Sequence, residues 1–281
     1  MLLKLLRSGA ATVIRTLRPR TAGQSDFPVE HLTRLAQLHA RAPIDTHLDV
    51  LYAGVMLGEL RFLDLYRDCI LQSETSVSPW KSFVRIRAAW NLAQYFLYAL
   101  ELDGLRAECG VFKGFSALLA CRAASALHTA YTGAGFHLID SFAGFPEPRT
   151  EDFIAQRQAQ DGVAKFAPAY RVGDASAPLQ EVQRVLKAYP EFRFHDGFIP
   201  SVLATLPDAR WTFVHIDVDL FEPTLASLEY FYPRMVDRGI MICDDYGSLL
   251  FPGARKAWDQ FCDRNAIRFV VLETGQSVIL K

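Results

Sequence analysis

The feature that most constrains the fold is the alternation of short apolar segments with longer amphipathic segments from Leu105 onward. A parallel sheet covered by helices produces this pattern, because each strand is followed by a crossover helix. The last two apolar segments are separated only by residues 273–276, a length that suits a hairpin. The sequence therefore predicts an α/β fold with a Rossmann-like sheet, closed by a final strand that runs antiparallel to its neighbour.

The elements of this sheet can be assigned by residue range. Strands are expected at residues 105–109, 136–139, 192–195, 211–216, 240–243, 267–272 and 277–280. Helices are expected at residues 116–131, 178–188, 223–235 and 253–264. Before Leu105 the pattern is helical and contains no convincing strand, with candidate segments at 55–71 and 80–100. We therefore divide the chain into a basic segment (1–28), an N-terminal helical cap (29–104) and an α/β domain (105–281).

The basic segment carries five Lys or Arg residues before the first acid, Asp26. It could form an amphipathic helix on an anionic membrane surface, but a flexible, solvated chain end is the interpretation we favour. We expect neither a membrane-spanning helix nor a secretory signal here, because no uninterrupted apolar run is long enough.

Composition narrows the class of protein. The chain has 281 residues, 51% of them hydrophobic, and a formal net charge of −1, which fits a globular protein and makes nucleic acid an unexpected partner. Its five cysteines follow neither a disulfide framework nor zinc-site spacing. A cytoplasmic setting is therefore expected.

The clearest chemical signal is a pair of acidic blocks at two predicted strand ends. Asp217 and Asp219 follow one buried strand, and Asp244 and Asp245 follow the next. The carboxyl ends of parallel strands meet at one edge of a sheet, where α/β folds bind ligands. Clustered carboxylates repel one another unless a cation lies between them, and Mg²⁺ prefers oxygen ligands. The sequence predicts a Mg²⁺ site there, with Asp219 slightly favoured as a supporting acid and His215 as a core residue.

Three further loops indicate a nucleotide-like cofactor. Gly110 and Gly114 lie in the first strand-to-helix turn, where backbone amides can approach a ligand, although a turn used only for helix packing would look similar. Asp140 ends the second strand, where α/β folds hold ribose hydroxyls, and it is followed by Ser141 and Phe142. A third loop at the next strand end contains Asp196, Gly197 and Phe198 and could flank an adenine ring.

The blocks at residues 108–114, 140–146, 215–221 and 243–247 together resemble the macrocin and mycinamicin O-methyltransferase family. Resemblance to this family, over roughly residues 105–281, implies a class I methyltransferase fold that uses S-adenosylmethionine and Mg²⁺. It implies that Asp217 is both a metal ligand and the general base, and that Asp244 and Asp245 complete the metal site. It also implies that Glu108 and Gly110 line the methionine end of the cofactor, Asp140 the ribose, and Gly197 with Phe198 the adenine. The chain departs from the family pattern at residues 112–115, where a bulky Phe115 follows Gly114.

The predicted function is methylation of a hydroxyl on a sugar, a glycosylated metabolite or a glycan that presents vicinal hydroxyls. Mg²⁺ bound to two neighbouring hydroxyls would weaken the proton of the attacking oxygen, and Asp217 would remove it. A catechol presents the same pair of oxygens, so a catechol-type methyltransferase is an alternative. A binding protein that keeps the fold without turnover is a second alternative, and the helical cap could serve as a homo-oligomer interface.

Overall fold

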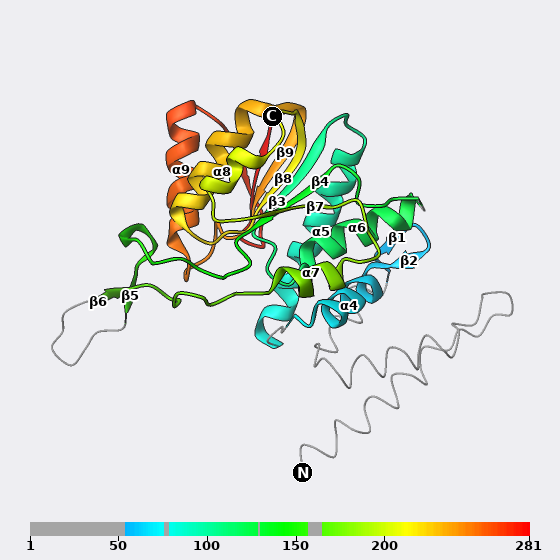
Figure 1. Cartoon of the computed structure of the whole chain (residues 1–281), viewed down its shortest axis with the longest axis horizontal. Coiled ribbons are helices and arrows are strands. Elements are labelled where there is room, and N and C mark those ends of the chain that lie inside the picture. The colour runs from blue at the N-terminus through cyan, green and yellow to red at the C-terminus, as the bar shows by residue number, and fades with distance from the viewer. Residues whose placement is uncertain (1–53, 76–78, 129, 157–164) are drawn as a thin grey trace, which may run out of the picture. The chain divides into compact units, whose positions relative to one another are not determined.

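The computed structural model describes residues 54–75, 79–128, 130–156 and 165–281 (Figure 1). The basic segment and the beginning of the predicted cap, residues 29–53, lie outside the described residues. Among the residues that are described, no helix is long and apolar enough to cross a membrane.

Seven strands form the main sheet in the described part of the chain, in the order β10-β11-β9-β8-β3-β4-β7. In chain order these are β3 (Leu105–Cys109), β4 (Phe136–Asp140), β7 (Arg193–Asp196), β8 (Trp211–Ile216), β9 (Met235–Cys243), β10 (Val270–Val271) and β11 (Ser277–Leu280). Strands β7, β4, β3, β8 and β9 pair in parallel, whereas β11 lies antiparallel between β9 and β10. The predicted α/β sheet with a closing antiparallel hairpin is confirmed.

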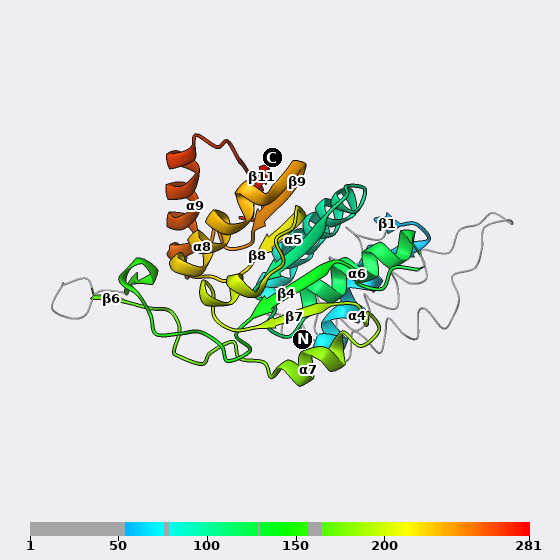
Figure 2. The ribbon, with the colours of Figure 1, turned by 45° about the horizontal axis from the view of Figure 1, so that its top comes forward.

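Helices cover both faces of this sheet (Figures 1 and 2). One face packs against α4 (Phe62–Ser73), α5 (Pro79–Leu100), α6 (Phe115–Leu127) and α7 (Leu179–Val185). The other face packs against α8 (Phe221–Phe231), α9 (Pro252–Asn265) and the short 3₁₀ helix η2 (Ser201–Thr205). Every residue of β8 is buried, as expected for a central parallel strand with helices on both sides. The described helices of the predicted cap thus share a core with the sheet, and the three-part domain division itself stays a prediction.

All five cysteines are buried and free. Cys69 and Cys121 belong to the core on the α5 and α6 side, and Cys109, Cys243 and Cys262 belong to the core on the α8 and α9 side. Burial raises the pKa of Cys69 and of Cys109 to about 12. The thiols therefore behave as small apolar core groups.

A long loop excursion carries small elements of its own, separate from the main sheet. An excursion between β4 and α7 contains the 3₁₀ helix η1 (Thr150–Asp152) and a small hairpin of β5 (Ile154–Gln156) and β6 (Lys165–Ala167). Asp152 accepts a hydrogen bond of 2.8 Å from the backbone N–H of Phe221, at the start of α8. This carboxylate therefore satisfies an otherwise unpaired donor of the helix N-terminus just beyond Asp219.

Several predicted boundaries were wrong. The prediction of no strand before Leu105 fails at β1 (Met56–Leu57) and β2 (Leu60–Arg61), which form a tight hairpin through Gly58, a residue with φ +57°. Helix α4 accordingly begins at Phe62. Helix α8 ends at Phe231, and a short 3₁₀ turn, η3 (Tyr232–Arg234), leads into β9 at Met235. Pro233 in that turn lacks an N–H and cannot continue the helix.

Candidate active site

A cavity of about 570 Å³ opens at the carboxyl edge of the parallel strands. Its walls come from the loops that follow β3, β4, β7, β8 and β9, from α5, and from the turn between β10 and β11. This is the place where ligands bind in open α/β sheets.

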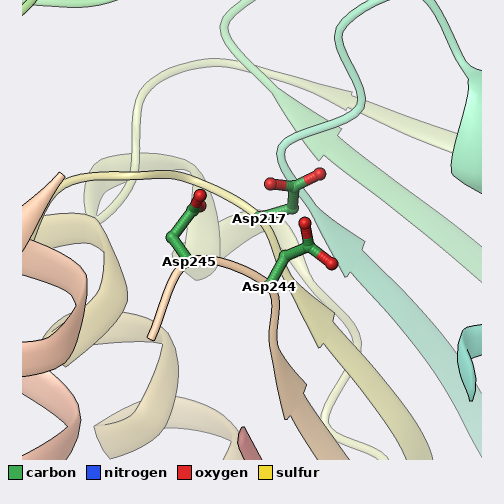
Figure 3. A group of neighbouring side chains, drawn as sticks. All are labelled: Asp217, Asp244 and Asp245. Atoms are coloured by element: carbon green, nitrogen blue, oxygen red, sulfur yellow. The ribbon is translucent and has the colours of Figure 1, made fainter. Parts of the chain in front are cut away.

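The floor of the cavity holds the acidic cluster predicted from the sequence. One carboxylate oxygen from each of Asp217, Asp244 and Asp245 lies within 4.8 Å of the other two (Figure 3). Asp217 directly follows β8, and Asp244 and Asp245 directly follow β9, so the parallel register of these strands brings the carboxylates together. Asp219 also lines the cavity, from a left-handed backbone position with φ +61°.

The glycine turn after β3 is in direct contact with the acidic loop. Gly110 has φ +86°, and a Cβ atom there would lie 1.8 Å from the carbonyl oxygen of Asp217. The Asp217 N–H donates a hydrogen bond of 2.8 Å to the carbonyl of Cys109. Only glycine fits where these two backbones approach each other. The turn expected to hold a cofactor therefore contacts the loop expected to hold a metal through the backbone.

Electrostatics indicate that the acids of the cluster outweigh the positive charge beside them. Burial and the neighbouring carboxylates raise the pKa of both Asp217 and Asp245 well above the usual range, and burial raises that of Asp219 to about 7. In addition, Oδ2 of Asp245 is buried and has no hydrogen-bond partner among the described residues. Oxygen donors with these properties fit a hard divalent cation, which would favour the ionised form of every acid around it.

His215 lies beneath the cluster, 2% exposed, between two acids. Its Nδ1 is 3.4 Å from Oε1 of Glu108, and its Nε2 is 3.7 Å from Oδ1 of Asp244. Burial disfavours the charged imidazole, but the two carboxylates outweigh burial and raise the pKa of His215 to about 10. A protonated imidazole has no lone pair for a metal and cannot act as a base. In this state His215 is a buried counter-charge.

Asp140 has its carboxylate engaged by backbone amides. Oδ2 accepts hydrogen bonds from the N–H groups of Val111 at 2.7 Å and Phe112 at 2.9 Å, and Oδ1 accepts one from Phe142 at 2.7 Å. Asp140 therefore fixes the shape of the glycine turn. A carboxylate offers about four lone-pair positions, so one remains for a ligand hydroxyl in the cavity that Asp140 lines.

The other predicted cofactor residues divide into two groups. Gly110, Ser141, Gly197 and Phe198 line the cavity, and the Phe198 side chain is 46% exposed. Four others do not line it: Glu108, Gly114, Phe142 and Asp196. Glu108 is 1% exposed and accepts a hydrogen bond from Ser116. Gly114 directly precedes α6 with φ +78°, and a Cβ atom there would contact Val182 of α7. The structure thus places these two behind the cavity wall.

Sequence reasoning missed several residues of the site. Arg85 of α5 lines the cavity. Its positive charge opposes the burial that raises the pKa of Asp219, and it contributes to the lowered pKa of Asp244. Gln276, from the turn before β11, donates a hydrogen bond of 2.8 Å to Oδ1 of Asp244. Phe145 and Phe251, whose ring centroids are 5.7 Å apart, supply an apolar wall. Arg85, Phe251 and Gln276 come from segments in which no local motif marked them, whereas Phe145 lies within the 140–146 block without having been singled out.

Comparison with known proteins agrees with this geometry. The profile of the macrocin O-methyltransferase (TylF) family matches residues 96–276. The chain belongs to this family. It is therefore an O-methyltransferase, and the resemblance of the four sequence blocks is confirmed.

Individual relatives are more distant. The chain is 28% identical over 218 residues to 8-demethyl-8-(2,3-dimethoxy-alpha-L-rhamnosyl)-tetracenomycin-C 4'-O-methyltransferase of Streptomyces olivaceus. This match covers 70% of this chain and 79% of that protein. It is also 28% identical over 126 residues to demethyldecarbamoylnovobiocin O-methyltransferase of Streptomyces niveus, covering 43% and 45% of the two chains.

Solved structures support the class I methyltransferase fold. The O-methyltransferase NovP superposes with a TM-score of 0.54 at 23% identity, covering 70% of this chain and 80% of NovP. The calicheamicin methyltransferase CalS11 superposes with a TM-score of 0.52 at 20% identity, covering 94% and 99% of the two chains.

Proposed function

We propose that this protein transfers a methyl group from S-adenosylmethionine to a sugar hydroxyl of a glycosylated natural product, and that it requires Mg²⁺. The observation that carries the proposal is the convergence of Asp217, Asp244 and Asp245 beside the Gly110 turn, in one cavity. The sugar acceptor is supported by the relatives, since the tetracenomycin enzyme is named for methylation of a rhamnosyl compound.

The cofactor is assigned to the half of the cavity formed by the loops after β3, β4 and β7. The Gly110 turn would face the methionine part, the free lone pair of Asp140 would receive a ribose hydroxyl, and Gly197 with Phe198 would face the adenine. An exposed aromatic ring such as Phe198 offers an apolar face on which a purine can stack.

The metal is assigned to Asp217, Asp244 and Asp245. When bound, a divalent cation supplies a Lewis acid that lowers the pKa of an acceptor hydroxyl. Asp217 holds the proton that leaves this hydroxyl, because it lies on the side of the cluster next to the Gly110 turn. As the O–CH₃ bond forms, the S–CH₃ bond breaks, and the sulfonium becomes the neutral thioether of S-adenosylhomocysteine.

The remaining walls suit a large acceptor. Phe145, Leu250 and Phe251 add apolar side chains to the cavity lining, and Leu250 is 47% exposed. Such a surface can contact the apolar part of a glycosylated molecule while its sugar reaches the carboxylates.

Methyl transfer to a panel of glycosylated natural products and catechols would test the proposal. We expect turnover with deoxysugar-bearing acceptors, loss of turnover in excess chelator, and recovery on addition of Mg²⁺. Full turnover in chelator would refute the metal assignment, and turnover with catechols alone would refute the sugar assignment.

A further inference from the structure

The turn between β10 and β11 contacts the proposed metal site. This turn lies outside the sequence blocks from which the cofactor and metal sites were predicted. Gln276 lies in this turn and is 1% exposed. Its Nε2 donates a hydrogen bond of 2.8 Å to Oδ1 of Asp244. The same turn also holds the loop that follows Asp245, because the Gly247 N–H donates a hydrogen bond of 2.7 Å to the carbonyl of Gly275.

The orientation of the Gln276 amide is determined by its other partners. Its Oε1 accepts hydrogen bonds from the Thr274 hydroxyl at 2.9 Å and from Asn91 Nδ2 at 3.3 Å. Its Nε2 also reaches the carbonyl of Ala88 at 3.4 Å. Because a carboxylate and a carbonyl can only accept, the NH₂ group must face Asp244. Asn91 and Ala88 belong to α5, so this helix contributes to the alignment.

The two oxygens of Asp244 therefore have different surroundings. Oδ1 receives the Gln276 hydrogen bond and faces Nε2 of His215 at 3.7 Å. One oxygen of Asp244 points toward Asp217 and the other points away from it (Figure 3). Because Oδ1 already accepts the Gln276 hydrogen bond, Oδ2 is the oxygen that we assign to a cation held by the cluster.

We propose that Gln276 is a positioning residue for the metal site, and that Asn91 acts through it. Gln276 fixes the rotation of the Asp244 carboxylate so that Oδ2 alone is offered to the cation. This inference rests on the proposed metal assignment and adds residues outside the acidic blocks. Partners of this kind orient metal ligands, and their loss commonly weakens metal affinity by about 10-fold or more.

Metal affinity can be measured without turnover, through the loss of the free Mn²⁺ electron paramagnetic resonance signal on titration with protein. We expect Gln276→Met to weaken Mn²⁺ binding by about 10-fold, since it keeps the side-chain length and removes the donor to Asp244. Asn91→Ala should weaken binding less, because Thr274 still holds the Gln276 amide. If Asn91 acts through Gln276, the double variant should bind no more weakly than Gln276→Met alone.

A matched control is Gln72→Met on α4. Gln72 is a part-buried glutamine whose amide bridges the carbonyl of Val185 and the side chain of Arg122, and it does not line the cavity. It should lose thermal stability and keep wild-type Mn²⁺ affinity. Equal Mn²⁺ affinity of wild type and Gln276→Met would refute the positioning role and leave the metal site intact. Absence of Mn²⁺ binding by the wild type would refute both the metal assignment and this inference.

Discussion

Replacing Asp140 with Ala should damage the protein before any ligand is added. The Asp140 carboxylate accepts backbone hydrogen bonds from Val111, Phe112 and Phe142, at 2.7, 2.9 and 2.7 Å. Each such bond contributes about 0.5–1.5 kcal/mol net, so losing all of them should lower the free energy of unfolding by about 2–4 kcal/mol. For a domain of this size that is a fall in Tm of about 5–15 °C. S-adenosylmethionine affinity should fall as well, because the turn beneath the cofactor loses its shape and the ribose loses an acceptor.

Calorimetry of the cofactor-free protein and titration with S-adenosylhomocysteine separate the two effects. Ser141→Ala is a suitable control, because its hydroxyl makes only longer contacts of 3.2 Å with Gly144 and Ala143 in the same loop. It should shift Tm by much less than Asp140→Ala. An unchanged Tm for Asp140→Ala would show that the carboxylate does not support the turn, and unchanged S-adenosylhomocysteine affinity would remove Asp140 from the cofactor site.

The remaining predictions concern the acidic cluster. Asp217→Asn should lower the rate of single-turnover methyl transfer by about 100-fold or more at saturating Mg²⁺, because it removes the proton acceptor. Cofactor affinity should change little, and a wild-type rate would place the base elsewhere. Asp245→Ala should raise the Mg²⁺ concentration needed for half-maximal turnover, and an unchanged Mg²⁺ requirement would exclude Asp245 as a ligand. Metal-free protein should lose thermal stability as the pH rises from about 4 to about 7, because the pKa of Asp219 rises on folding from 3.8 to about 7 and the folded state holds an extra proton in this range. Mg²⁺ should reduce this slope, as should Asp219→Asn, and a metal-free stability that rises over this range would contradict the assigned shift.

The sheet and the acidic cluster could be predicted because their signals are local. A buried parallel strand is a continuous apolar run, and the residues after it must appear at the carboxyl edge. That is why Asp217, Asp244 and Asp245 could be brought together from their positions after two neighbouring runs. The hairpin at the C-terminus was predictable for the same reason, since the short spacing leaves no room for a crossover helix.

The supporting contacts could not be predicted, because they join segments far apart in the chain. Asn91 and Gln276 are 185 residues apart, and nothing in either neighbourhood marks them as partners. Glu108 was predicted to line the cofactor site but lies behind the cavity wall. There it accepts a hydrogen bond from Ser116 of α6 and lies beside the buried His215. The hairpin at Met56–Arg61 was missed because its apolar residues also fit a helical period, and only Gly58 signals the turn.

Buried cysteines lie on both sides of the sheet, so their labelling can measure how often the helices on each side move away from it. Cys69 and Cys121 are sealed under one helical layer, and Cys109, Cys243 and Cys262 under the other, all of them with a raised pKa. An alkylating reagent can reach any of them only during a transient opening, so the labelling rate of each cysteine measures the frequency of that event. Mass spectrometry of timed samples would then show which layer loosens first, and which one a bound cofactor or metal holds closed.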